Sequence, residues 1–189
     1  ITYDQLRELL QSTWVQGGLN VTIIGIDDTC DTSIQSLSPS PLDAGFLDRA
    51  HRFLRAWRET GYQMWELDLL MRSSAVANNV LAPAGLLSLG TFRLLQDDTK
   101  LAADAQLAWF QPMDATAHLG PNNTTTSSLY ERVFLNPAVV SLHPDADLAA
   151  VASGAAIVDD TLSDHLAAIQ AALGMSGSDA NALVSLFAL

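Results

Sequence analysis

Cysteine and lysine are almost missing from this chain, and each shortage excludes particular kinds of site or partner. Cys30 is the single cysteine, so an intramolecular disulfide is excluded and a thiolate metal site has no second cysteine. Lys100 is the only lysine, and nine basic residues face twenty-one acidic ones for a formal net charge of −12. A phosphate backbone would meet net repulsion, so we expect no nucleic-acid partner.

Long apolar runs are missing as well. A membrane-spanning helix needs about 18–20 consecutive apolar residues, and the most apolar stretch, Leu86–Leu95, is interrupted by serine, glycine, threonine and arginine. We therefore expect no membrane contact by this chain. A hydrophobic content of 49% still predicts a packed core. Because the chain begins with Ile1 and shows no signal-peptide pattern, we expect it to be a fragment of a larger protein.

The local signatures of catalysis are missing too. The sequence has no G-x-S-x-G and no glycine-rich phosphate loop, and its four histidines stand in four separate contexts. Two groups could touch a hard cation: His143 with Asp145 and Asp147, and the group Asp27, Asp28 and Asp31. Neither has the glycine and terminal glutamate of a calcium loop, so loop caps and turn residues are the favoured interpretation of both. The prediction is no catalytic residue, no metal site and no cofactor.

What the chain does contain is helix-forming sequence. Apolar residues recur at three- and four-residue steps, with a threonine cap at Thr2, a glycine stop at Gly61 and a capping box from Ser128 to Glu131. The predicted helices are 3–11, 42–60, one directly after Gly61, 83–96, 101–110, one starting at Ser128 and ending at Asn136-Pro137, 161–173 and 178–189. Val21–Ile26 predicts a short strand, and 27–41 and 111–127 predict loops.

These elements predict a mainly α fold, an irregular multi-helix bundle with a long loop and at most a short extended strand. We expect one helical domain over residues 1–189, with a sub-division into 1–110 and 128–189 joined by the loop 111–127. The helix after Gly61 carries apolar residues around most of its circumference, so it is expected to be buried on several sides. The apolar residues of the helix after Pro83 predict another buried helix.

Four of the nine basic residues lie on the helix 42–60, outside its apolar stripe: Arg49, Arg52, Arg55 and Arg58. One interpretation is a solvated face with ion pairs such as Asp48 to Arg52, four residues apart. The other is an interface in which Arg52 and Arg55 clamp the carboxylates of a neighbouring segment. The sequence leaves both interpretations open.

Two dense segments carry a family resemblance. RFLRAWRETGYQMWELD (Arg52–Asp68) resembles the arginine- and tryptophan-rich helical segment of the A subunits of Tc toxin complexes, which are related to the Salmonella plasmid virulence A protein. SLYERVFLNPAV (Ser128–Val139) is similar to the second signature of that family, and the two follow in the same order.

The resemblance implies a non-catalytic piece of the helical shell of a pore-forming, toxin-translocating subunit. The parent would be secreted or carried on the bacterial surface, would form a homopentamer and would work with toxin B and C subunits. This segment would contact other segments of the same A chain. The residues implied to hold its helices together are Arg52, Arg55, Trp57, Trp65, Asp68, Tyr130, Glu131 and Phe134.

Two other functions compete with the shell interpretation. A free-standing helical module could bind a protein partner through an apolar groove. A hydrolase could be assembled from distant His, Asp and Ser residues, and it would need a polar cleft with perturbed titration.

Overall fold

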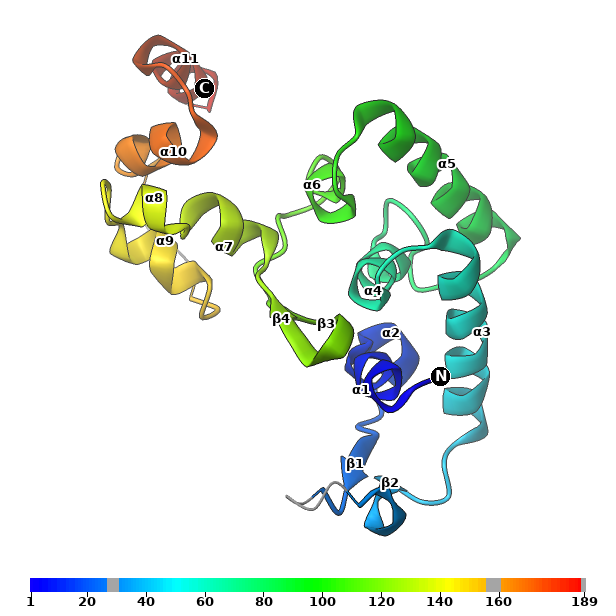
Figure 1. The fold of residues 1–189 in the computed structure, drawn as a ribbon. Coiled ribbons are helices and arrows are strands. Elements are labelled where there is room, and N and C mark those ends of the chain that lie inside the picture. Colours follow the sequence, from blue (N-terminus) through cyan, green and yellow to red (C-terminus); the bar gives the residue numbers. More distant parts are fainter. Residues whose placement is uncertain (27–30, 156–160, 188–189) are drawn as a thin grey trace. The chain divides into compact units, whose positions relative to one another are not determined.

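The chain is described by a computed structural model, which covers residues 1–26, 31–155 and 161–187 (Figure 1). Helices dominate, and the predicted mainly α fold is confirmed. Asp27, Asp28 and Cys30 lie outside the described residues, as do the last two residues of the helix predicted to end at 189.

The chain forms two compact units. The first consists of Ile1–Pro112 together with His118–Thr126, and the second of Met113–Ala117 together with Ser127–Leu189. The polypeptide therefore passes from one unit to the other three times, after Pro112, after Ala117 and after Thr126. Within the described residues, no helix is both long and apolar enough to cross a membrane.

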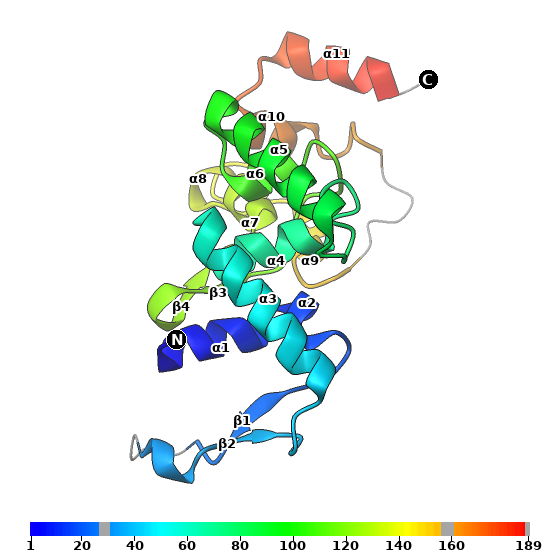
Figure 2. The same ribbon diagram turned by 90° about the vertical axis from the view of Figure 1, so that its right-hand side faces the viewer.

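The first unit contains six helices among its described residues. These are α1 (Tyr3–Gln11), α2 (Thr13–Gln16), α3 (Ala44–Thr60), α4 (Met64–Arg72), α5 (Pro83–Thr99) and α6 (Ala103–Leu107). The capping signals act as predicted, because Thr2 forms a capping box with Gln5 and Gly61 ends α3 in the left-handed conformation. Helices α1 and α2 lie against α4, and α2 also packs on α3 (Figure 2).

The core of this unit is centred on α4. Met64, Leu67, Leu70 and Met71 are completely or almost completely buried, and Leu69 is nearly so, as the sequence predicts for a helix covered on several sides. Phe53 of α3 and Val15 of α2 add the next large side chains. The nine-residue α4 thus contributes six buried residues, against four from the seventeen-residue α3, because neighbours surround it.

Two short antiparallel strand pairs complete the first unit. β1 (Thr22–Ile24) pairs with β2 (Ser36–Ser38), with Ile23 opposite Leu37, and β3 (His118–Gly120) pairs with β4 (Thr124–Thr126), with Leu119 opposite Thr125. The strand expected in 21–26 is present. The expectation of two irregular loops at 27–41 and 111–127 was wrong, because each contains a strand or hairpin as well as a 3₁₀ turn, Thr32–Ile34 or Pro121–Asn123. The second turn and its hairpin pack on α1 and α4.

Helix α5 departs most from the prediction. It continues past the expected stop at Gln96 and ends at Thr99, before Lys100 in the left-handed conformation. Only one side of it is buried, through Gly85, Leu89 and Phe92. The expectation of a buried helix was wrong, because Leu86, Leu87 and Leu94 are 51%, 73% and 67% exposed.

The second unit contains five short helices among its described residues. They are α7 (Leu129–Phe134), α8 (Pro137–Val140), α9 (Ala146–Val151), α10 (Leu166–Leu173) and α11 (Gly177–Phe187). The Ser128–Glu131 capping box starts α7 as predicted. Pro137 does more than end that helix, because it also begins α8 behind the cap of Asn136. Helix α9 was not predicted, since its sequence was interpreted as a loop with acidic residues.

Candidate functional site

The carboxylate of Asp68 holds the first unit together at the junction of α1 and α2. Asp68 lies on α4 and is only 6% exposed. Its Oδ1 atom accepts hydrogen bonds from the Ser12 hydroxyl at 2.6 Å and from the Trp14 backbone N–H at 2.8 Å. Its Oδ2 atom lies 2.9 Å from Nε of Arg72 in an ion pair. Both oxygens of this buried group are therefore used inside the chain.

Trp14 extends this junction into the core. Its Nε1–H donates to the carbonyl oxygen of Asn79 at 2.9 Å, and its ring stacks on Phe53 with 6.1 Å between ring centroids. Arg49 of α3 binds the other end of α2, donating to the carbonyl oxygens of Val15 and Gln16 at 2.8 and 3.1 Å. These contacts clamp α2 from both ends.

The two central tryptophans of the first signature have different surroundings. Trp57 of α3 is half-buried against the core. Trp65 of α4 stacks on His118 of β3, with ring centroids 4.8 Å apart and an interplanar angle of 12°. This stack fixes the β3–β4 hairpin on α4, a contact that sequence reasoning missed because the partners are far apart in the chain.

A groove runs between α3 and α5, and two signature arginines line it. The groove has a volume of ≈ 650 Å³. Its lining residues are Arg52, Arg55, Ala56, Glu59 and Thr60 from α3, Leu81, and Leu86, Leu89, Gly90 and Arg93 from α5. Three guanidinium groups thus surround an apolar floor, and Glu59 is the one carboxylate among these lining residues.

Two of the groove arginines have partners within the first unit. Arg52 pairs with Asp48 at 3.6 Å, as the four-residue spacing predicts, and also donates to the carbonyl oxygen of Leu81. Arg93 pairs with Asp97 at 3.7 Å and lies over the Tyr62 ring, 5.4 Å from its centroid. Exposed pairs of this kind contribute at most about 1 kcal/mol. Sequence reasoning missed Arg93 because α5 was expected to be buried.

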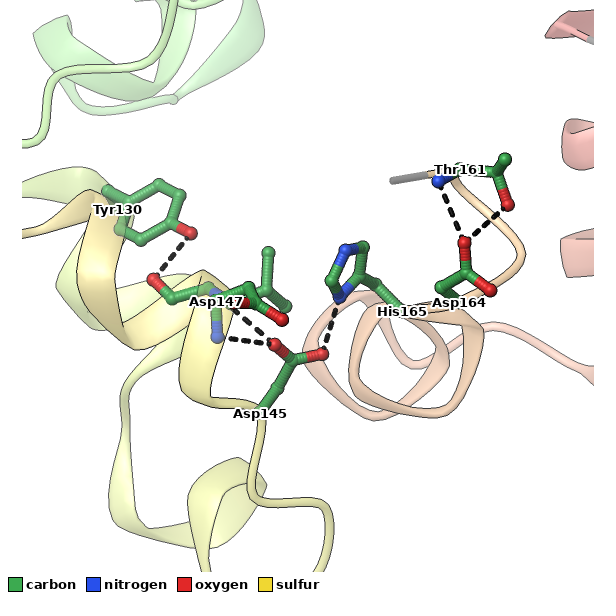
Figure 3. Close-up of polar contacts among 7 residues, drawn as sticks. Tyr130, Asp145, Asp147, Thr161, Asp164 and His165 are labelled. Atoms are coloured by element: carbon green, nitrogen blue, oxygen red, sulfur yellow. Dashed lines mark hydrogen bonds and ion pairs between the residues drawn. The ribbon is translucent and has the colours of Figure 1, made fainter. Parts of the chain in front are cut away.

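The second signature organises the second unit. Tyr130 and Phe134 of α7 lie with ring centroids 5.0 Å apart, and the Tyr130 hydroxyl donates to the carbonyl oxygen of Leu148 at 2.8 Å (Figure 3). Burial and then the nearby Asp145 carboxylate raise the pKa of Tyr130, which keeps the hydroxyl protonated as a donor. Glu131 closes the capping box by accepting from the Ser128 N–H at 2.9 Å.

Asp145 and His165 form the most polar contact of the second unit (Figure 3). Nδ1 of His165 lies 2.7 Å from Oδ2 of Asp145, while Oδ1 accepts from the N–H groups of Asp147 and Leu148. Burial alone would raise the pKa of Asp145, but the Leu148 N–H, His165 and the Asp147 N–H together lower it below its usual value. The carboxylate both caps α9 and orients the imidazole.

The cation candidate of the sequence is rearranged here. Asp145 and Asp147 do lie together, but the histidine beside them is His165, twenty residues away, and His143 is exposed and does not join them. The three side chains offer ligand atoms within 4.8 Å of one another. A hydrogen bond and a helix cap already account for Asp145, so this cluster does not become our candidate site.

The signature residues are therefore not gathered at one site: Tyr130, Glu131 and Phe134 lie on α7 of the second unit, and the others lie in the first unit. Arg52 and Arg55 share the α3–α5 groove, while Trp57, Trp65 and Asp68 pack or bond within the first unit. The groove is our candidate functional site, because it combines a hollow, an apolar floor and three guanidinium groups against one carboxylate. Comparison of the chain with protein-family models, curated proteins and solved structures yields no match.

Proposed function

We propose that this chain is a non-catalytic helical segment of the shell of a Tc toxin A-like subunit. The observation that carries the proposal is the Asp68 carboxylate, which accepts two hydrogen bonds and one ion pair from the same unit. A buried acid used in this way locks helices together and is not presented to a substrate. Tyr130 and Glu131 of the second signature are likewise used in contacts within their unit.

On this proposal the parent is a secreted or surface-borne toxin subunit that forms a pentamer and cooperates with B and C subunits. This segment forms part of the shell, and its exposed surfaces contact other parts of the same A chain. The exposed leucines of α5 fit that role, because apolar side chains of a wall segment are covered when the neighbouring wall is in place.

A test is to express the chain alone and within the polypeptide encoded by the surrounding reading frame. Hydrogen exchange on both should show stronger protection of α5 in the longer polypeptide, with the Asp68 junction protected in both. An Asp68→Ala variant of the longer polypeptide should lose pentamer assembly. A reading frame that ends with this chain, or unchanged protection of α5, would contradict the shell proposal.

The second candidate is a free-standing interaction module, and the arginine-lined groove between α3 and α5 favours it. Here the groove itself would be the functional surface, and the chain would act without a longer parent. Native mass spectrometry of the chain separates the two candidates. A stable, stoichiometric complex with one cognate protein supports the module, whereas a monomer that associates only with its own parent segments supports the shell.

A further inference from the structure

We propose that the groove between α3 and α5 is a docking site for an amphipathic helix with carboxylates along both sides of its apolar stripe. The proposal goes beyond the function proposed above, since it concerns the chemistry of one surface.

The two walls of the groove have the spacing of helix faces. On α3 the lining positions are 52, 55, 56 and 59, followed by Thr60, and on α5 they are 86, 89, 90 and 93. Each set follows the i, i+3, i+4, i+7 pattern of one helix face. Both walls carry a small residue at the third position, Ala56 and Gly90, so the middle of the groove is wide enough for a bulky side chain.

Gly90 has no explanation within the first unit. Glycine in a helix interior is less stable than alanine by about 1 kcal/mol. A Cβ atom added at Gly90 would meet nothing within 4 Å, so no neighbour in the structure requires glycine there. A second helix packing closely against α5 does require it, because glycine permits close approach of two backbones.

The backbone chemistry of the walls favours a helix over an extended peptide. Both walls belong to helices of seventeen residues, whose interior N–H and C=O groups already bond along their own helix. An extended peptide would find few backbone partners there and would leave its own polar groups unpaired. A helix satisfies its backbone internally and offers only side chains, as in other helix-in-groove complexes.

Charge defines which helix fits. Three of the chain's nine basic residues, Arg52, Arg55 and Arg93, gather in this groove although the net charge is −12. Planar guanidinium groups bind carboxylates through paired hydrogen bonds. The apolar floor, with Leu81, Leu86 and Leu89, takes leucine-like side chains. The complementary partner therefore has an apolar stripe flanked by Asp or Glu.

The experiment uses the whole chain and two labelled peptides of about 18 residues, or five helical turns. Both carry leucine at the i, i+3, i+4, i+7 positions; one has glutamate on the flanks and the other lysine. Fluorescence anisotropy should show the glutamate peptide binding at least about tenfold more tightly than the lysine peptide.

Three variants locate the site. Arg55→Glu should lower the affinity for the glutamate peptide by about tenfold and raise the affinity for the lysine peptide. Gly90→Leu should lower the affinity for both peptides, because the new side chain fills the groove. Circular dichroism should show that this variant stays folded. Arg58→Glu is the matched control, because Arg58 is exposed on the same helix but does not line the groove, and its binding should be unchanged.

Three outcomes would overturn the proposal. The first is equal affinity for the two peptides. The second is glutamate-peptide binding that Arg55→Glu and Gly90→Leu both leave unchanged while the variants remain folded. The third comes from sedimentation of the chain without peptide: a dimer that Arg55→Glu dissociates would place a second copy in the groove.

Discussion

The hydroxyl of Ser12 donates a 2.6 Å hydrogen bond to the carboxylate of Asp68, across fifty-six positions of sequence. The same oxygen accepts the backbone N–H of Trp14, so one acidic side chain fixes the connection between α1 and α2 on the surface of α4. Contacts between residues so far apart in the sequence are needed to hold α2 in place, because helices as short as α2 are not stable alone.

The first prediction concerns this junction. Asp68→Ala removes the acceptor of two hydrogen bonds and leaves the Ser12 hydroxyl and the Trp14 N–H buried without it. We expect the free energy of unfolding of the first unit to fall by about 3 kcal/mol. Asp68→Asn keeps one acceptor oxygen and should cost less. Urea unfolding followed by tryptophan fluorescence measures both, since all four tryptophans lie in the first unit.

Asp98→Ala is the matched control for Asp68→Ala, because Asp98 is exposed on α5. Its effect should stay within about 0.5 kcal/mol. Equal losses in Asp68→Ala and Asp98→Ala would show that the junction has no special role.

Two glycines of α5 should respond in opposite directions to the same substitution. A Cβ at Gly85 would lie 2.4 Å from the backbone oxygen of Val80, so Gly85→Ala should destabilise by about 1–3 kcal/mol through overpacking. Gly90 has open space, so Gly90→Ala should stabilise by about 0.5–1 kcal/mol through helix propensity. Thermal unfolding of the two variants measures both effects. A shift of the melting temperature in the same direction for both variants would contradict the geometry of α5.

The pH dependence of stability should contain a contribution from Glu8. This side chain is 7% exposed, and burial followed by the nearby Asp4 carboxylate raises the pKa of its carboxyl group. The folded chain therefore holds this proton to a higher pH than the unfolded chain. Its contribution to stability is most favourable at low pH and declines as the pH rises through the raised pKa.

Glu8→Gln removes the titrating carboxyl group, and with it the loss of stability as the pH rises. The variant should be more stable than the parent at pH 7, and the difference should shrink as the pH falls below the usual range for glutamate, about pH 4. Urea titrations of parent and variant at several pH values give the comparison. A variant less stable than the parent at pH 7 would show that the Glu8 carboxylate makes a favourable contact instead.

Asp145 should show the opposite pH behaviour. Its pKa is lowered, so its stabilising contribution is present above the ordinary value and is lost as the pH falls through the lowered one. Asp145→Ala should cost the second unit about 1 kcal/mol near neutrality through loss of the α9 cap, and should flatten its acid unfolding below about pH 4. NMR of resonances from α9 and α10 reports this, with Asp147→Ala as the control for an exposed neighbour.

Local chemistry was enough to predict several helix ends. The Thr2 cap, the Gly61 stop and the Ser128–Glu131 capping box depend on residues within a few positions of one another, and the structure has all three. Sequence reasoning failed where distant partners decide. The exposure of α5, the pairing of Trp65 with His118, and the choice of His165 over His143 beside Asp145 all depend on tertiary contacts that leave no periodic pattern.

The candidate groove was half visible in the sequence. Sequence reasoning singled out Arg52 and Arg55, and both line the groove. The alternative that they clamp carboxylates of a neighbouring segment stays a prediction. The opposite wall was hidden, because Leu86, Gly90 and Arg93 had been assigned to a buried helix. An exposed apolar helix and a buried one have the same composition, and only the packing of α5 distinguishes them.

The route of the chain between its two units has a consequence for evolution and for engineering. The polypeptide passes between them after Pro112, Ala117 and Thr126. Each unit therefore includes a segment that lies, in the sequence, between two segments of the other unit. No single cut yields two intact halves: ending at Pro112 deprives the first unit of its β3–β4 hairpin, and starting at Ser127 deprives the second of Met113–Ala117. Gene fusion or exon exchange must therefore transmit the pair together.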